Sequence, residues 1–284
     1  MKKRTHAFDY GSVLKYALIF FGFVLFNKLE HDTAPYSVAL YATAMFMNCS
    51  LITTPLLLLG SFAVLGAFGL MAAAAVPAVF FIFVRLLYGK SKVKPSFEYV
   101  LFCAISMTGY LVVGDTGAQI PIEKRIIVSI ITVVLSLLGM IAFRALDKKG
   151  LRSKFGFEEK VAAAAMTVAA GLGISNLFSP LVWKSVTVFL VLLCCYVYRF
   201  GLGSFIAAVF GISLAVYYGN VEYIAVSLVF GIVADTFMGV SGYLAALAVI
   251  LSDYVIELVF GVYGGYSVSE FLPVAIGAAA FCII

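Results

Sequence analysis

The stretch from Tyr243 to Val262 reads "YLAALAVILSDYVIELVFGV", a long apolar run that contains two acids. About 20 consecutive apolar residues make a helix that is long enough to cross the hydrocarbon core of a membrane. The run lacks the alternation typical of strands, so it predicts a transmembrane helix and not a strand of a membrane barrel. Asp253 and Glu257 are four residues apart, which places both carboxyl groups on one face of that helix.

The composition of the whole chain also indicates a membrane protein. Of its 284 residues, 64% are hydrophobic and only 12% are charged, whereas soluble domains average about 25% charged residues. The sequence therefore predicts an all-α, polytopic integral membrane protein whose main partner is the lipid bilayer. The formal net charge of +5 is small and spread out, so we expect no nucleic-acid partner.

Similar apolar runs recur along the chain, and we predict ten to twelve transmembrane helices. The block 35–89 contains almost no charge, and two long tilted helices, or a pair of helices plus a re-entrant piece, would also cover it. The candidate segments are 12–27, 35–50, 52–68, 69–89, 97–114, 125–144, 160–178, 183–199, 202–218, 222–239, 243–262 and 268–284.

The distribution of basic residues predicts the orientation of these helices. Lysines and arginines cluster at the N-terminus, in the loop near 90 and in the loop near 150, and such clusters favour the cytoplasm. The loops near 30 and 220 contain few cations and suit the outside. An even number of spans follows, with both termini in the cytoplasm. Lys124 and Arg125 are an exception, because this arrangement places them outside.

The longest polar segment is a basic cytoplasmic loop over about 145–160. Its phenylalanines are spaced to dip into a membrane interface beside basic neighbours, which indicates a loop that lies on anionic lipid. A docking surface for a cytoplasmic partner is the alternative. The candidate docking residues are Lys148, Lys149, Arg152 and Lys154.

Small residues recur within several predicted helices, where they allow helix backbones to approach closely. We expect them to serve helix packing, with a substrate path as the alternative reading. The residues are Ala165, Ala169, Gly173, Gly201, Gly203, Gly211, Gly231, Gly239 and Gly242.

Three acids, Asp235, Asp253 and Glu257, lie inside predicted spans. An acid at the centre of a bilayer costs about 2.5–3.5 kcal/mol on insertion scales, and such residues often mark proton or cation relays. The cations in or beside the spans all lie near helix ends, so we expect none at the depth of Asp253. A polar seam between helices, or acids that reach an interface, is then favoured over a relay. These cations are Lys15, Arg85, Arg144, Lys184 and Arg199.

No motif in the sequence supports catalysis. The chain contains no GxxxxGK[ST], HExxH or GxSxG pattern and no clustered His/Cys ligand set. Its five cysteines all fall within apolar segments, where they are expected to act as small buried hydrophobes. We therefore predict no catalytic residue, cofactor site or metal ligand in this chain.

The layout of the chain resembles the N-terminal membrane region of the stage II sporulation protein E family. A basic N-terminus and first helix lead to "PYSVAL" (35–40), short apolar spans and a basic loop. "FGFEEKVAAAAMTVAAGLG" (155–173) follows, then glycine-rich helices from "YRFGLGSFIAAVFGISLAV" (198–216) to "FGIVADTFMGVSGYLAALAVIL" (230–251), and the chain closes in "EFLPVAIGAAAFCII" (270–284).

The resemblance implies an architecture and a function. Members of that family join about ten spans to a self-association region and a manganese-dependent serine phosphatase. The phosphatase dephosphorylates an anti-sigma-factor antagonist and so releases a forespore sigma factor. The family also interacts with the division protein FtsZ at the polar septum.

For this chain, the resemblance implies a membrane anchor that localises such a phosphatase to the sporulation septum. The chain stops within an apolar run, so a cytoplasmic phosphatase domain is expected beyond Ile284. No phosphatase aspartate lies in 1–284, and the chain itself is not expected to be an enzyme. The alternative function is a proton- or cation-coupled transporter of small molecules, with Asp235, Asp253 and Glu257 along its path.

Overall fold

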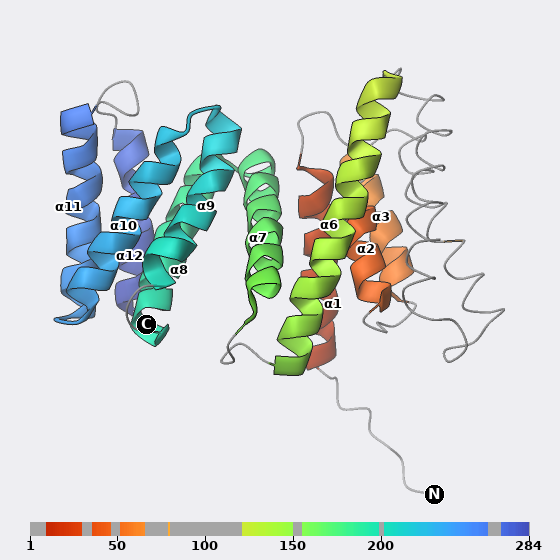
Figure 1. Cartoon of the computed structure of the whole chain (residues 1–284), viewed down its shortest axis with the longest axis horizontal. Helices are drawn as coiled ribbons and strands as arrows, with labels where there is room; N and C mark the ends of the chain where they lie inside the picture. The colour runs from red at the N-terminus through yellow and green to blue at the C-terminus, as the bar shows by residue number, and fades with distance from the viewer. Residues whose placement is uncertain are drawn as a thin grey trace, which may run out of the picture. The chain divides into compact units, whose positions relative to one another are not determined.

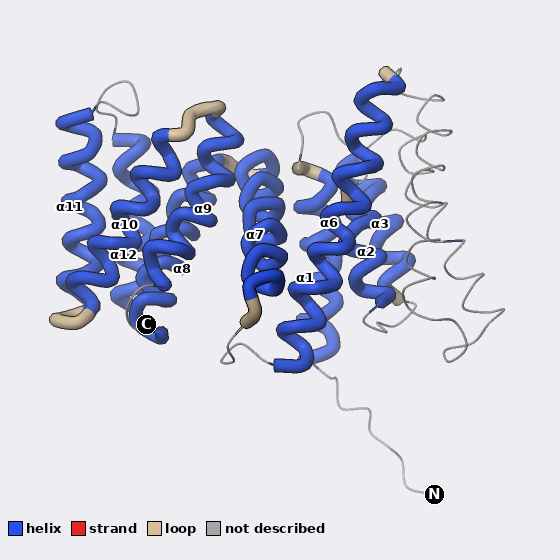
Figure 2. The backbone as a smooth tube through the Cα atoms, viewed as in Figure 1, coloured by secondary structure: helices blue, strands red, loops and turns tan. Residues whose placement is uncertain are grey.

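The computed structural model describes residues 10–29, 36–46, 52–65, 79, 121–149, 155–198, 202–260 and 268–283 (Figure 1). In these ranges the regular secondary structure is α-helical, and no strand occurs (Figure 2). The predicted all-α fold is therefore confirmed for the part of the chain that the structure describes.

The helices coincide with the predicted spans, and their ends differ from the predictions by a few residues. The predicted spans 69–89 and 97–114 lie outside the described residues, apart from Val79. The helices are α1 (Tyr10–Asn27), α2 (Ser37–Phe46), α3 (Thr53–Leu65), α6 (Ile122–Lys149), α7 (Phe157–Leu177), α8 (Pro180–Tyr198), α9 (Leu202–Tyr218), α10 (Glu222–Met238), α11 (Gly242–Phe260) and α12 (Val268–Ile283).

Four of the described helices are long and apolar enough to cross a membrane. They contain the stretches Ile122–Asp147, Phe157–Leu177, Pro180–Val197 and Gly242–Val259. The apolar stretches in α1, α3, α9 and α12 are shorter than 18 residues. The described helices are thus those of a helical membrane protein, with four clear candidates for spans.

The chain divides into two compact units, Met1–Ala163 and Ala164–Ile284, which are described separately. In the first unit, α2 packs against α1, α3 and α6. Its residues from Tyr36 to Thr43 are all buried except Leu40, which is partly buried. A helix that is apolar on every side and buried on every side belongs at the centre of its unit.

The last residue of α1 supplies a hydrogen-bond acceptor to the start of α2 in this unit. The Asn27 side-chain oxygen accepts a hydrogen bond from the Ser37 backbone N–H at 3.2 Å, and Asn27 Nδ2 donates to Ser61 Oγ at 3.4 Å. All three residues are fully buried. The first N–H groups of a helix lack partners within the helix, so Asn27 acts as a cap supplied by a neighbouring helix.

In the second unit, α9 and α10 form a hairpin whose turn is readable in the sequence. Gly219 has a φ of 65°, a conformation that glycine adopts without steric cost. The Asn220 N–H donates to Ala215 O at 3.1 Å, which is the hydrogen bond that closes a Schellman motif. The Glu222 N–H donates in turn to Asn220 Oδ1 at 2.9 Å and so begins α10.

Small residues bring α9 and α10 into close contact. A Cβ atom at Gly231 would lie 2.5 Å from Ser204 Cα, and one at Gly211 would lie 2.7 Å from Ser227 Cβ. These distances are too short for a real side chain, so only glycine fits at both positions. The prediction that these two glycines serve helix packing is confirmed.

The helix α8 is central to the second unit, because it packs against α9, α10, α11 and α12. Trp183 at its start is buried; its ring meets Phe210 edge-on at a centroid distance of 5.5 Å, and its Nε1 donates to Phe210 O at 3.3 Å. A Cβ at Gly171 of α7 would lie 2.5 Å from this indole. The start of α8 is therefore tightly held, which fixes the position of the next residue, Lys184.

Candidate charged site

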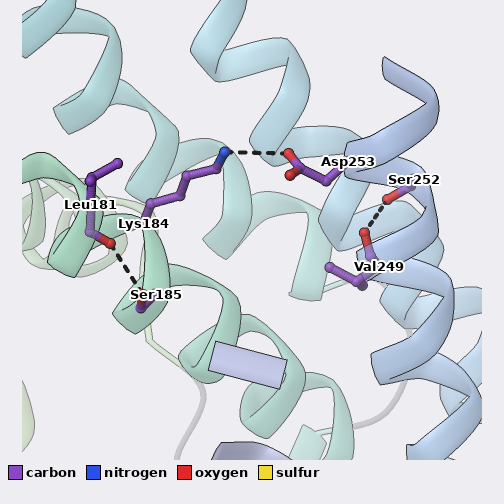
Figure 3. Close-up of polar contacts among 6 residues, drawn as sticks. All are labelled: Leu181, Lys184, Ser185, Val249, Ser252 and Asp253. Carbon is purple, nitrogen blue, oxygen red and sulfur yellow. Dashed lines mark hydrogen bonds and ion pairs between the residues drawn. The ribbon is translucent and has the colours of Figure 1, made fainter. Parts of the chain in front are cut away.

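A buried ion pair joins α8 to α11. Lys184 Nζ lies 3.4 Å from Asp253 Oδ1, and the two side chains are only 4% and 3% exposed. Figure 3 shows the lysine reaching across from α8 to the carboxylate on α11. An ammonium and a carboxylate that leave water together neutralise each other, which offsets part of the large cost of burying each charge.

Local sequence fixes the start of α8 and with it the position of Lys184. Ser179 Oγ accepts a hydrogen bond from the Leu181 N–H at 3.2 Å, which caps the helix, and Pro180 occupies the first helical position. Ser185 then donates to Leu181 O at 3.1 Å (Figure 3). Lys184 thus begins the second turn of α8.

The helix α11 presents its acids to the protein and its apolar residues to the outside. Asp253 and Glu257 are both buried, at 2% and 7% exposure. Leu251, Val255 and Leu258 between and beside them are exposed. The predicted common face of the two acids is therefore the buried face, while the opposite face has the apolar character that lipid requires.

The expectation that no cation lies at the depth of Asp253 is wrong. Lys184 is near the start of α8, as its sequence position indicates, but this part of α8 lies beside the later half of α11. The long side chain of lysine then carries the ammonium group the remaining distance. Which helices become neighbours depends on packing, which the order of spans along the chain does not specify.

Asp235 lies in a different contact, at the start of α9. Its Oδ2 accepts hydrogen bonds from the Ser204 N–H at 3.2 Å and from Ser204 Oγ at 3.3 Å. A carboxylate at the N-terminal end of a helix interacts favourably with the free N–H groups and with the helix dipole. Asp235 of α10 thus caps α9. Cys195 of α8 also lies close to Gly203, because a Cβ atom at Gly203 would clash with the sulfur atom of Cys195.

The structure does not bring the three acids together at one level. Asp235 precedes the α10–α11 turn at Val240 by a few residues, whereas Asp253 follows that turn by more than three helical turns. For two antiparallel helices, the difference between these two sequence distances from the turn corresponds to about 12 Å along the helix axis. The acids therefore lie in two separate polar contacts, Asp253 with Lys184 and Asp235 with Ser204.

The candidate docking residues lie partly within a helix. Lys148 and Lys149 belong to the last turn of α6, whereas Arg152 and Lys154 lie outside the described residues. Helix resumes at Phe157, because Glu159 Oε2 accepts a hydrogen bond from the Gly156 N–H at 2.7 Å, which is half of a capping box. The non-helical part of the predicted 145–160 loop is therefore shorter than the sequence indicates.

Several residues of these contacts were not among the predicted site residues. Lys184, Ser204 and Cys195 complete the contacts of the acids, and Asn27 with Ser37 and Ser61 forms the buried polar contact of the first unit. One signal was available for Lys184, since it is a lysine within an apolar span in a chain with acids in other spans. The serines carry no such signal.

Within the described ranges, no group of three or more His, Cys, Asp or Glu side chains is placed to hold a metal ion.

Comparisons with known proteins identify no relative of this chain. No family model matches the chain, and no curated protein or solved structure is significantly similar to it. A function for this chain is therefore inferred from its own residues and from the resemblance in layout.

Proposed function

We propose that this chain is a multi-spanning membrane domain that anchors a cytoplasmic serine phosphatase and localises it to the sporulation septum. The observation that carries the proposal is the pairing of Lys184 with Asp253 inside apolar helices. Internal pairing keeps charge away from lipid and fixes α8 against α11, which suits a rigid anchor. The resemblance to the membrane region of the stage II sporulation protein E family supplies the phosphatase and the septum.

The proposal includes a topology of ten to twelve spans with both termini in the cytoplasm. The basic clusters near the N-terminus, near 90 and near 150 support this orientation. A phosphatase that follows the last span would then lie in the cytoplasm beside its substrate, with manganese bound in that domain. Self-association and binding to FtsZ are the partner interactions that the same resemblance supports.

The localisation of a fluorescent fusion in sporulating cells tests this function. The fusion carries the fluorescent protein at the N-terminus of the full reading frame that contains residues 1–284. We expect a band at the asymmetric septum, and uniform fluorescence around the whole membrane would count against the anchor. The reading frame itself offers a second test, since a phosphatase domain encoded after Ile284 is required.

A second function, a proton- or cation-coupled transporter of small molecules, is favoured by one observation. Lys184, Asp253 and Glu257 are three ionisable side chains buried among apolar helices, and such residues within membrane spans commonly line ion paths. Reconstitution in liposomes with an enclosed pH-sensitive dye tests this function. A transporter should carry protons under an imposed potential, and Asp253→Asn should reduce that flux, whereas an anchor should show none above that of empty liposomes.

A further inference from the structure

The helix α10 is bounded at both ends by turns that the structure describes, so its length is defined. It contains 17 residues, from Glu222 to Met238, between the flanking residues Val221 and Gly239. Figure 2 shows the two turns, drawn in tan, at opposite ends of this helix. At about 1.5 Å per residue, α10 is about 25 Å long, whereas the hydrocarbon core of a typical bilayer is about 30 Å thick. The helix is therefore short for a typical membrane.

Tyrosines gather at the end of the second unit where α9 passes into α10. The rings of Tyr218, which ends α9, and Tyr223, in the first turn of α10, stack with centroids 4.5 Å apart and planes 8° apart. Tyr217 meets Tyr218 edge-on at 5.2 Å. Because Tyr223 is buried and Tyr218 is 38% exposed, the stack holds an exposed ring against the helices. The exposed Glu222 lies beside it and accepts a hydrogen bond from Asn220 Nδ2 at 3.0 Å.

Further tyrosines lie at the opposite end of the second unit. Tyr196 near the end of α8 and Tyr243 at the start of α11 are 64% and 71% exposed. Tyr196 meets Phe281 of α12 edge-on, with ring centroids 6.1 Å apart, and a Cβ atom at Gly242 would lie 3.3 Å from the same phenylalanine ring. These contacts place Tyr196 and Tyr243 at one level, near the end of α10 that Gly239 follows.

The surface of α10 and α11 between the two groups of tyrosines is apolar. Its exposed side chains include Leu228, Ile232, Leu247, Leu251 and Val255. The exposed Thr236 donates its hydroxyl to Ile232 O at 2.7 Å, within its own helix. The charges of Lys184 and Asp253 are buried against each other. Lipid chains offer no hydrogen-bond partner, and a surface of this kind requires none from them.

Tyrosine concentrates at the boundaries between lipid and water, because its ring is apolar and its hydroxyl can reach water. We propose that the two groups of tyrosines lie at the two boundaries of a bilayer and that the second unit fits a hydrocarbon layer about 25 Å thick, thinner than that of a typical membrane. The whole length of α10 then crosses this layer. The proposal rests on the membrane-domain part of the proposed function and deepens it by naming the kind of bilayer that the second unit fits.

Unfolding in bilayers of graded thickness tests the fit. The full chain is reconstituted in nanodiscs of one phosphatidylcholine at a time, with monounsaturated chains that lengthen from dimyristoleoyl through dipalmitoleoyl, dioleoyl and dieicosenoyl to dierucoyl lipid. The emission of the buried Trp183 reports unfolding of the second unit. We expect the highest unfolding temperature in dimyristoleoyl or dipalmitoleoyl lipid and a fall of a few degrees toward dierucoyl lipid, because hydrophobic mismatch costs free energy. A maximum in dioleoyl or any longer lipid, or no dependence on chain length, overturns the proposal.

The depth of the tyrosines is tested separately with lipids brominated at one position of the acyl chain, which quench nearby tryptophans. Tyr218→Trp and Tyr243→Trp each add an exposed tryptophan to one group, and Ile232→Trp is the matched control between them. Trp183 is 3% exposed, so its emission in the unmodified protein is the background to subtract. We expect bromine near the headgroup to quench the two tyrosine variants most, and bromine near the chain end to quench Ile232→Trp most. Deep quenching of either tyrosine variant, or shallow quenching of Ile232→Trp, overturns the proposal.

These outcomes are independent of the septal localisation that tests the anchor function. A fusion that reaches the septum, together with a stability maximum in thick lipid, upholds the anchor and overturns the fit to a thin bilayer. Uniform fluorescence around the cell, together with a maximum in thin lipid, does the reverse.

Discussion

Lys184 Nζ lies 3.4 Å from Asp253 Oδ1, so an ammonium group of α8 and a carboxylate of α11 neutralise each other within the helices of the second unit. Removal of one partner leaves the other charge buried without this ion pair. We therefore expect Lys184→Met or Asp253→Leu to reduce the free energy of unfolding by about 3–5 kcal/mol. Thermal unfolding in detergent, followed by circular dichroism, measures the loss.

The double variant separates what the ion pair contributes to the free energy of unfolding from the cost of burying one charge without the other. Lys184→Met with Asp253→Leu replaces both charges by apolar groups, which is often neutral or stabilising. We expect it to recover most of the stability that either single variant loses. Ser252→Ala serves as the control, because its hydroxyl donates within its own helix, to Val249 O at 2.8 Å. A double variant as unstable as the worse single variant would contradict this account.

The cap that Asp235 provides to α9 gives a second prediction. Asp235→Ala removes the acceptor for the Ser204 N–H and Oγ, and loss of a helix cap costs about 0.5–2 kcal/mol. Asp235→Asn keeps an acceptor oxygen and should lose clearly less. The chain contains a single tryptophan, Trp183, whose burial makes its emission a reporter of unfolding of the second unit. Equal losses in the two variants would argue against a capping role.

The close approach of α9 and α10 gives a third prediction. The Cβ atom in Gly231→Ala would lie 2.5 Å from Ser204 Cα and 2.7 Å from Gly203 O. Backbone atoms cannot move aside as a side chain can, so the helices must separate, at a cost of about 1–3 kcal/mol for overpacking. Ile232→Ala, on the exposed side of the same turn, is the matched control and should change the unfolding temperature little.

The buried contact of the first unit gives a fourth prediction. Asn27→Ala leaves the Ser37 N–H without its acceptor in a fully buried position, and such a group costs about 1–3 kcal/mol. Asn27→Asp restores an oxygen acceptor but adds a charge, so it should not fully recover the lost stability. Circular dichroism is the appropriate measurement, since Trp183 lies in the other unit.

The positions of the helices were predictable from sequence because they depend on local apolar runs. The α9–α10 turn was equally readable, since Gly219 and Asn220 carry the chemistry that a helix end and a helix start require. The partner of Asp253 was not predictable. Lys184 meets it only because α8 packs beside the later half of α11, and such neighbours are set by the fit of small and large side chains.

The helix α2 shows a second limit of the sequence. Runs at 35–50 and 52–68 predict spans, and the described residues within them form α2 (Ser37–Phe46) and α3 (Thr53–Leu65). Hydropathy cannot separate a helix buried within protein from a helix that faces lipid, since both are apolar all round. In α2 the distinction comes from burial on every side and from the contacts of Ser37 and Tyr41 with α3.

The ion pair also imposes an order on biosynthesis. Lys184 enters the membrane with α8, whereas Asp253 arrives only after α9, α10 and most of α11 have been made. Until then, the nascent protein must keep a lysine at the edge of the lipid or hold it in the insertion machinery. The Lys184–Asp253 ion pair can therefore form only after the chain has been made as far as Asp253 in α11, so α8 acquires its charged partner late.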